Sequence, residues 1–205
     1  MGGDARGAGV GRAHWLVGPG DRLGVLQSGV PAVNGSGQLA FSATLDEAVY
    51  NTGLWFGAIG HMTTIARQGA PAPEFGALVT CGTLDMFSST APNILINSAG
   101  QVLYSGTVVG PGIGGANNWV MWAGTPGSVH IIVREGSTVS GGMSGPTWLG
   151  AEQAVLTDVG AVAFYRDTNG NGTWDESDDL LSADATGSDG WSWRVSTAGW
   201  TLGEH

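Results

Sequence analysis

A turn sequence of the form Asn-x-x-Gly recurs along this chain at nearly constant spacing, and this recurrence constrains the fold more than any other feature. Residues 33–45 (VNGSGQLAFSATL) reappear as residues 96–108 (INSAGQVLYSGTV), 63 residues later (97 − 34 = 63). A weaker third copy, residues 156–164 (LTDVGAVAF), follows after a further 60 residues (157 − 97 = 60). Sequence similarity at a fixed period of this length indicates a protein built from repeated structural units.

Each copy has the pattern of a β-hairpin. Gly37, Gly100 and Gly160 supply the positive φ of a tight turn, and an aromatic residue stands four positions after each glycine. Alternation after the first turn gives the next strand two faces, an apolar face and a smaller, more polar face: Leu39, Phe41, Ala43 and Leu45 against Ala40, Ser42 and Thr44. We expect the apolar face to pack and the smaller face to be open to water.

A second set of matched residues recurs with a slightly longer period. Trp55 and Trp122, like the glycines and arginines around them, pair at an offset of 67 (122 − 55 = 67). The four extra residues fall in the Gly-rich stretch 110–116, which behaves as a surface loop. Each unit therefore offers four short strands joined by tight turns, which is an antiparallel meander.

Composition favours the same fold class. The 205 residues include 37 glycines and only 12% charged residues, and no long stretch has the 3.6-residue apolar period of a helix. We predict an all-β fold of antiparallel four-stranded meander repeats that resemble β-propeller blades, with a β-sandwich as the alternative. The expected segments are a loosely ordered start or tail of a preceding repeat (1–24), repeat unit 1 (25–90), repeat unit 2 (91–150), and a third repeat or partial Ig-like segment (151–205).

Charge and hydropathy exclude several classes of partner. The net charge is −10 and all seven basic residues are arginine, so the chain lacks the surface that neutralises phosphates and is not expected to bind nucleic acid. The sequence has no run of about 18 apolar residues, so we do not expect it to insert into a membrane. Residues 1–20 lack the apolar segment of a signal peptide. The lone cysteine, Cys81, is interpreted as a small buried hydrophobic residue.

A loop near the carboxyl end has the spacing of a calcium site. Counting from Asp167, oxygen-bearing groups fall at positions that match an EF-hand loop, and Gly172 occupies the sixth position, where such a loop turns sharply. The candidate ligands are Asp167, Asn169, Asn171, Thr173 through its carbonyl, Asp175 and Asp178. Because residues 161–165 have the pattern of a strand, the site would lie on a β scaffold. The alternative is an Asx- and Gly-rich hairpin loop whose side chains bond their own backbone.

Two stretches resemble known bacterial families. Residues 25–164, with Asn34, Gly37, Ala40 and Phe41 in the first copy, resemble the NxxGxxAF tandem repeat of large exported proteins. The second copy departs from that motif at Leu103-Tyr104, and the third has Thr157 in place of Asn. Residues 155–205, with the DxNxNG loop and the stretches around Trp191-Trp193 and Ser196–Trp200, resemble a truncated Ig-like module of bacterial surface proteins. Neither resemblance implies an enzyme, and both imply modular extracellular or cell-surface proteins.

The resulting functional hypothesis is a non-catalytic structural or adhesion segment with a calcium-stabilised loop. Its partner would be an unidentified protein or glycan surface, and self-association could complete the repeat array. No nucleophile elbow, phosphate-binding loop or zinc-binding helix motif is present, so we assign no catalytic residue. The alternatives are a carbohydrate-binding module that uses the nine tryptophans and, more distantly, a fragment of a polysaccharide hydrolase. Trp191 and Trp193 share one face of a strand, where they would stack on sugar if exposed and pack in the core if buried.

Overall fold

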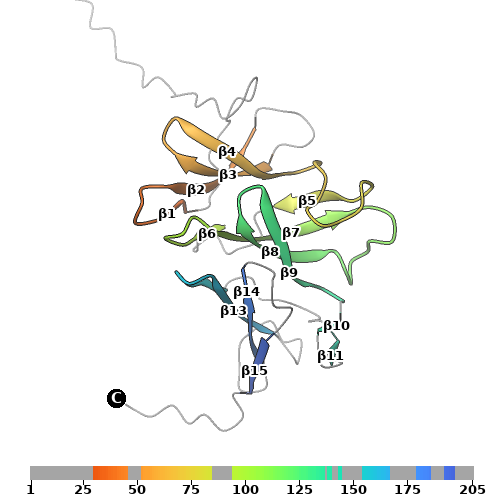
Figure 1. The fold of residues 1–205 in the computed structure, drawn as a ribbon. Helices are drawn as coiled ribbons and strands as arrows, with labels where there is room; N and C mark the ends of the chain where they lie inside the picture. The colour runs from red at the N-terminus through yellow and green to blue at the C-terminus, as the bar shows by residue number, and fades with distance from the viewer. Residues whose placement is uncertain are drawn as a thin grey trace, which may run out of the picture.

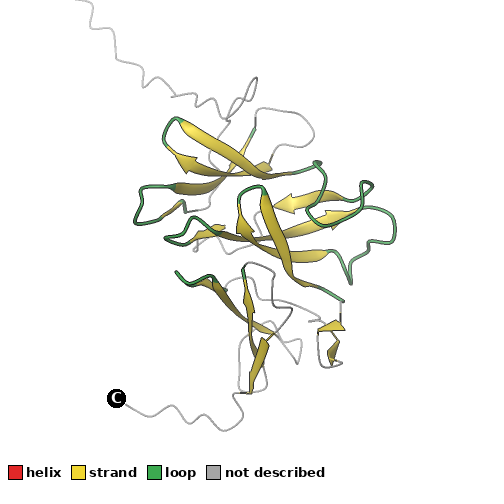
Figure 2. Ribbon diagram, viewed as in Figure 1, coloured by secondary structure: helices red, strands yellow, loops and turns green. Residues whose placement is uncertain are grey.

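The computed structural model describes residues 30–45, 52–84, 94–136, 138–139, 143–144, 154–166, 179–185 and 192–196. Every regular element within these ranges is a β-strand, which confirms the all-β prediction (Figure 2). The strands of the described residues form three larger sheets and one two-stranded ladder, and all of their pairings are antiparallel.

The first sheet is a four-stranded meander, as predicted for the repeat unit. Its strands are β1 (Ala32–Val33), β2 (Leu39–Thr44), β3 (Thr52–Ala58) and β4 (His61–Arg67), and each pairs with the next in the chain. The turn before β2 contains Gly37 at φ 75°, which confirms the expected positive φ.

The second sheet has one strand more than a four-stranded unit. It contains β5 (Thr80–Leu84), β6 (Ile94–Ile96), β7 (Val102–Val109), β8 (Trp119–Thr125) and β9 (Ser128–Arg134), in the order β5-β7-β8-β9. Strand β6 pairs with the first half of β7 and β5 with its second half. Two strands fit end to end because β7 has eight residues where its counterpart β2 has six.

The third sheet contains β12 (Val155–Leu156), β13 (Ala161–Arg166), β14 (Asp179–Asp184) and β15 (Ser192–Ser196), again paired in chain order. A separate short ladder joins β10 (Thr138–Val139) to β11 (Met143–Ser144). The three larger sheets follow one another in space as in sequence, so that the second lies between the first and the third (Figure 1).

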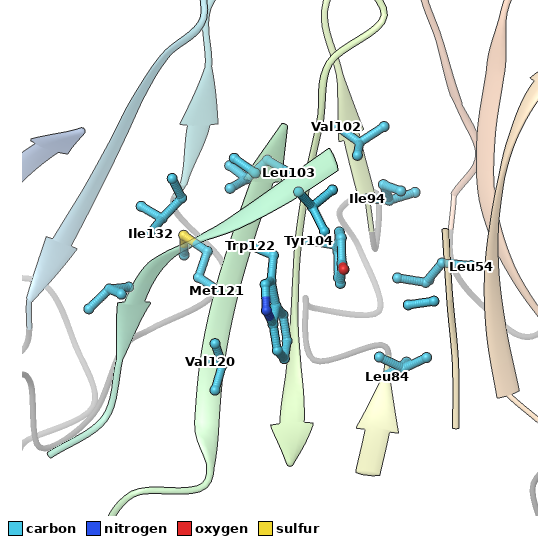
Figure 3. Close-up of a cluster of buried hydrophobic side chains, with 14 of the residues drawn as sticks. Leu54, Leu84, Ile94, Val102, Leu103, Tyr104, Val120, Met121, Trp122 and Ile132 are labelled. Carbon is cyan, nitrogen blue, oxygen red and sulfur yellow. The ribbon is translucent and has the colours of Figure 1, made fainter. Parts of the chain in front are cut away.

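The main core lies on both faces of this middle sheet. Tyr104 and Trp122 point to one side, toward Leu54 of the first sheet, and Met121 and Ile132 point to the other (Figure 3). Val162 and Phe164 of β13 belong to the same buried cluster. Burial of each large apolar side chain contributes about 1.5–3 kcal/mol, so the three sheets stabilise one another.

The packing of β2 differs from the sequence expectation. Its small-residue face is the one that meets the second sheet: Ala40 belongs to the main core, and Ser42 on the same face is 3% exposed. Small side chains allow the sheets to approach closely, so this face is not open to water. The larger apolar residues of the opposite face form a second buried cluster with Trp55.

Candidate functional site

The turns that precede β2, β7 and β13 share one hydrogen-bonding pattern. In the first, Asn34 Oδ1 accepts from the backbone N–H of Gln38 at 3.0 Å, and Gly37 N donates to Asn34 O at 3.0 Å. Asn97, Gly100 and Gln101 repeat these bonds in the second turn. A side-chain oxygen on the first residue therefore organises the turn by accepting the backbone N–H of the fifth. In the first turn Asn34 Oδ1 also accepts from Ser36 N at 3.0 Å, which is the bond of an Asx turn.

In the third turn a hydroxyl replaces the Asn side chain. Thr157 Oγ1 accepts from the backbone N–H of Ala161 at 2.9 Å, and Gly160 N donates to Thr157 O at 3.0 Å. The local turn is therefore kept without an amide at its first position. We call the three turns, residues 34–38, 97–101 and 157–161, the turn stack.

The asparagine amides join each turn to the next. Asn34 Nδ2 donates to Asn97 O at 3.0 Å, and Asn97 Nδ2 donates to Thr157 O at 2.9 Å. Each amide also donates to the glutamine of its own turn, to Gln38 Oε1 at 2.8 Å and to Gln101 Oε1 at 2.6 Å. One side chain thus fixes its own turn and holds the following sheet in register.

The glycines of the stack make room for these glutamines. A Cβ atom at Gly100 would lie 3.2 Å from Gln38 Oε1, and one at Gly160 would lie 2.9 Å from Gln101 Oε1. Both glycines are buried and adopt positive φ, 79° and 85°. The glycine is therefore required twice, by the backbone conformation and by the glutamine of the preceding turn.

Contacts between sheets were not predicted from the sequence, which indicated only a local turn role for Asn34 and Asn97. The sequence did contain a feature that could have indicated them. Both copies that begin with Asn have Gln at the fifth turn position, Gln38 and Gln101. A polar side chain that recurs in step with a buried asparagine indicates a hydrogen-bonded pair.

The last junction of the stack carries an extra bond. Asp158 accepts a hydrogen bond from the backbone N–H of Ser98 at 2.9 Å. This bond, with a second one from the Ser98 hydroxyl, lowers the pKa of the Asp158 carboxyl because both favour the charged form. The second and third turns are therefore joined by a charge-assisted bond in addition to the Asn97 amide.

A second polar cluster fixes the crossover from the first sheet to the second. The Glu74 carboxylate contacts His130 Nδ1 at 2.8 Å with one oxygen and accepts from Ile131 N at 2.6 Å with the other. Trp122 Nε1 donates to Pro73 O at 3.3 Å. Glu74 has a φ of 62°, an uncommon value for a non-glycine residue, and its two bonds to β9 compensate for that strain.

Cys81 and Tyr104 are buried together in the core. Burial raises the pKa of the Cys81 thiol to about 11. Burial, with a smaller contribution from Cys81, raises the pKa of the Tyr104 hydroxyl above its ordinary value. Both groups are therefore neutral at physiological pH, and a protonated thiol is a poor nucleophile.

A comparison with known protein families gives a match that spans all three larger sheets. A family profile matches residues 17–197. The chain belongs to DUF7453, a family of unknown function. The DUF7453 match extends from before β1 to the end of β15, so it includes the whole turn stack. No curated protein and no solved structure matches the chain.

The predicted calcium ligands fall inside the DUF7453 match but outside the described residues: Asp167, Asn169, Asn171, Thr173, Asp175 and Asp178. The strands on either side are described. β13 ends at Arg166, β14 begins at Asp179, and these two residues are paired, so residues 167–178 join the two strands of a hairpin. A strand before the loop agrees with the sequence prediction.

Two further findings concern the described part of the chain alone. It contains no group of three or more His, Cys, Asp or Glu side chains placed to hold a metal ion. No helix long and apolar enough to cross a membrane occurs within it. The side chains of Trp191 and Trp193, the candidate glycan-stacking residues, lie outside the described part.

Proposed function

We propose that this chain is a non-catalytic structural segment of an extracellular or cell-surface protein, in which stacked repeat units form a scaffold for adhesion. The observation that carries the proposal is the turn stack. The side chains that recur from unit to unit, Asn34 with Asn97 and Gln38 with Gln101, form bonds within and between turns. Residues that recur for such contacts build an array of sheets.

The aromatic pairs support the same proposal. Phe41 stacks on Trp55 with ring centroids 5.8 Å apart, and Tyr104 stacks on Trp122 at 5.3 Å. Each pair joins directly opposite residues of neighbouring strands. Cross-strand aromatic pairs stabilise sheets, so these recurring aromatic residues also act in the architecture.

The tandem-repeat, Ig-like and extracellular parts of the proposal rest on the sequence resemblances. Calcium bound to residues 167–178 would fix the hairpin loop between β13 and β14 and neutralise its carboxylates. The scaffold would then be more rigid in a calcium-rich medium.

Calcium binding is tested by thermal unfolding. The chain should melt at a higher temperature with calcium than with a chelator, because an ion that binds only the folded state stabilises it. Asp167→Ala should abolish the difference, whereas Asp4→Ala, which removes the same charge outside the loop, should leave it intact. An equal melting temperature with calcium and chelator would exclude the site.

The non-catalytic assignment is tested by incubating the purified chain with a panel of soluble polysaccharides and measuring reducing ends. We expect no release above the buffer blank. Reproducible release would overturn the proposal. Retention on a glycan array that is weakened by Trp191→Ala would instead favour the carbohydrate-binding alternative.

A further inference from the structure

The turn stack has a direction. In each junction the earlier turn donates an Asn amide to the carbonyl of the later turn, and its glutamine lies against the later glycine. We say that the earlier turn gives the contact and the later turn receives it. A turn that gives a contact needs Asn at its first position and Gln at its fifth. A turn that receives a contact needs an accessible carbonyl at its first position and glycine at its fourth.

The third turn can receive but cannot give. It retains Gly160 and the Thr157 carbonyl, which accept the contacts of Gln101 and Asn97. It has Thr157 where the donor amide would be and Ala161 where the glutamine would be. The stack therefore ends at the third sheet.

The first turn, in contrast, has the groups needed to give a contact and the groups needed to receive one. Asn34 and Gln38 make the contact to the second turn. On the receiving side, no other turn of the described residues covers the first one. Gly37 is exposed, and a Cβ atom built on it meets no atom of the described residues within 4 Å, whereas Gly100 and Gly160 are buried under glutamines. Val33, just before the turn, is 62% exposed.

The backbone carbonyl of Asn34 is equally available. Asn97 O and Thr157 O each accept two bonds, one from the glycine of their own turn and one from the preceding amide. Among the described residues, Asn34 O has the bond from Gly37 N and no side-chain amide above it. A carbonyl oxygen has two lone pairs, so one acceptor position is free for a further donor.

We propose that this receiving face, formed by Val33, the Asn34 carbonyl and Gly37, binds a β-turn from outside these 205 residues that carries Asn at its first position and Gln at its fifth. The two junctions within the chain show that this receiving chemistry takes that partner. The inference rests on the proposed scaffold role and names the contact through which the scaffold would extend.

The chain itself does not supply such a turn. The donors Asn34 and Asn97 are already bonded to the turns that follow them, and the third turn lacks both donors. Residues 1–29 contain no asparagine. The occupant is therefore a turn outside these 205 residues, in a unit that retains Asn at the first position and Gln at the fifth.

The binding test uses the full-length ¹⁵N-labelled chain and a backbone-cyclised peptide with the sequence of residues 94–104. This peptide carries Asn97 and Gln101 in their own turn, and the control peptide has N97A and Q101A. Because a contact of two to three weak bonds corresponds to a Kd on the order of 1 mM, the titration extends to about 5 mM. The first peptide should shift the amide signals of Ser36 and Gly37, and the control peptide should not.

A chain variant provides the matched control for the receiving face. Gly37→Asn places a side chain where the incoming glutamine would lie, and asparagine tolerates positive φ, so this variant should fold. It should show no response to the first peptide. Equal shifts with both peptides, or no shift at Gly37 with either, would overturn the proposal.

A second measurement does not depend on the peptide. The double variant Thr157→Asn, Ala161→Gln restores both donors to the third turn, and its copies should associate head to tail in sedimentation velocity as concentration rises. Adding Gly37→Asn to that variant should abolish the association. A folded double variant that sediments as the wild type does at every concentration would count against the receiving face. Neither readout involves calcium or polysaccharides, so a failure here is distinct from a failure of the proposed function.

Discussion

Alanine substitution at two glycines of the turn stack separates the cost of the turn from the cost of stacking. Gly37 and Gly160 have similar backbone conformations, with φ of 75° and 85°. Placing an L-residue in this left-handed region costs roughly 1–2 kcal/mol, and this term applies to both sites. The surroundings differ, because a Cβ at Gly37 meets no atom within 4 Å and one at Gly160 lies 2.9 Å from Gln101 Oε1.

Gln101 cannot move away from Gly160→Ala without loss. Its Oε1 accepts the Asn97 amide at 2.6 Å, and the same amide holds Thr157 O. Breaking one buried hydrogen bond costs about 1 kcal/mol. We therefore expect Gly37→Ala to lower the free energy of unfolding by about 1–2 kcal/mol and Gly160→Ala to lower it by about 1 kcal/mol more.

Urea unfolding followed by tryptophan fluorescence measures both values, provided that the slope of the transition is unchanged. The control is a double-mutant cycle, because Gly160→Ala in a Gln101→Ala background should cost no more than Gly37→Ala does. Equal costs for the two single variants, or a larger cost at Gly37, would refute the stacking role of the glutamine.

Three further predictions concern single side chains. The Ser105 hydroxyl is fully buried and has no hydrogen-bond partner among the described residues, so Ser105→Ala should raise the free energy of unfolding by about 1 kcal/mol, and a lower free energy of unfolding in urea would contradict this. Because the pKa of the Cys81 thiol is raised from 9.0 to about 11, the stability that it contributes is complete below pH 9 and falls as the pH rises toward 11. Iodoacetamide at pH 8.5 should therefore label Cys81 only after unfolding, and rapid labelling of the native chain would refute its burial. The lowered pKa of Asp158 stabilises the fold above pH 3.8 and loses this effect as the pH falls below that value through the lowered pKa. Wild type and Asp158→Asn should therefore differ in melting temperature at pH 7, and the difference should shrink as the pH falls below 3.8.

Local features of the fold were accessible from the sequence because they depend on neighbouring residues. The positive φ of Gly37, Gly100 and Gly160 follows from turn chemistry, and these predictions are confirmed. The alternation after each glycine predicts a strand, and β2, β7 and β13 begin close to the expected positions. The exposed loop 110–116 also agrees with the four-residue insertion inferred from the two offsets.

Features that depend on the spacing between sheets were not accessible in the same way. The Asn34 amide reaches Asn97 only because two sheets are stacked at a particular distance, which no local pattern encodes. The small-residue face of β2 packs inward for the same reason. Ala40 lies in the main core because a neighbouring sheet packs on that face. Strand β5 joins the second sheet because β7 extends beyond β6, and the sequence alone does not define where that extension ends.

The position of Glu74 has a consequence for solubility. Strand β9 is the last strand in the order of its sheet, and such an edge offers unpaired backbone N–H groups to strands of other molecules. The Glu74 carboxylate occupies one of these donors, the N–H of Ile131, and places a negative charge on the edge. Glu74→Gln would keep an acceptor there but remove the charge, and Glu74→Ala would leave the donor open. We expect both changes to make β9 easier to pair with a strand of another molecule.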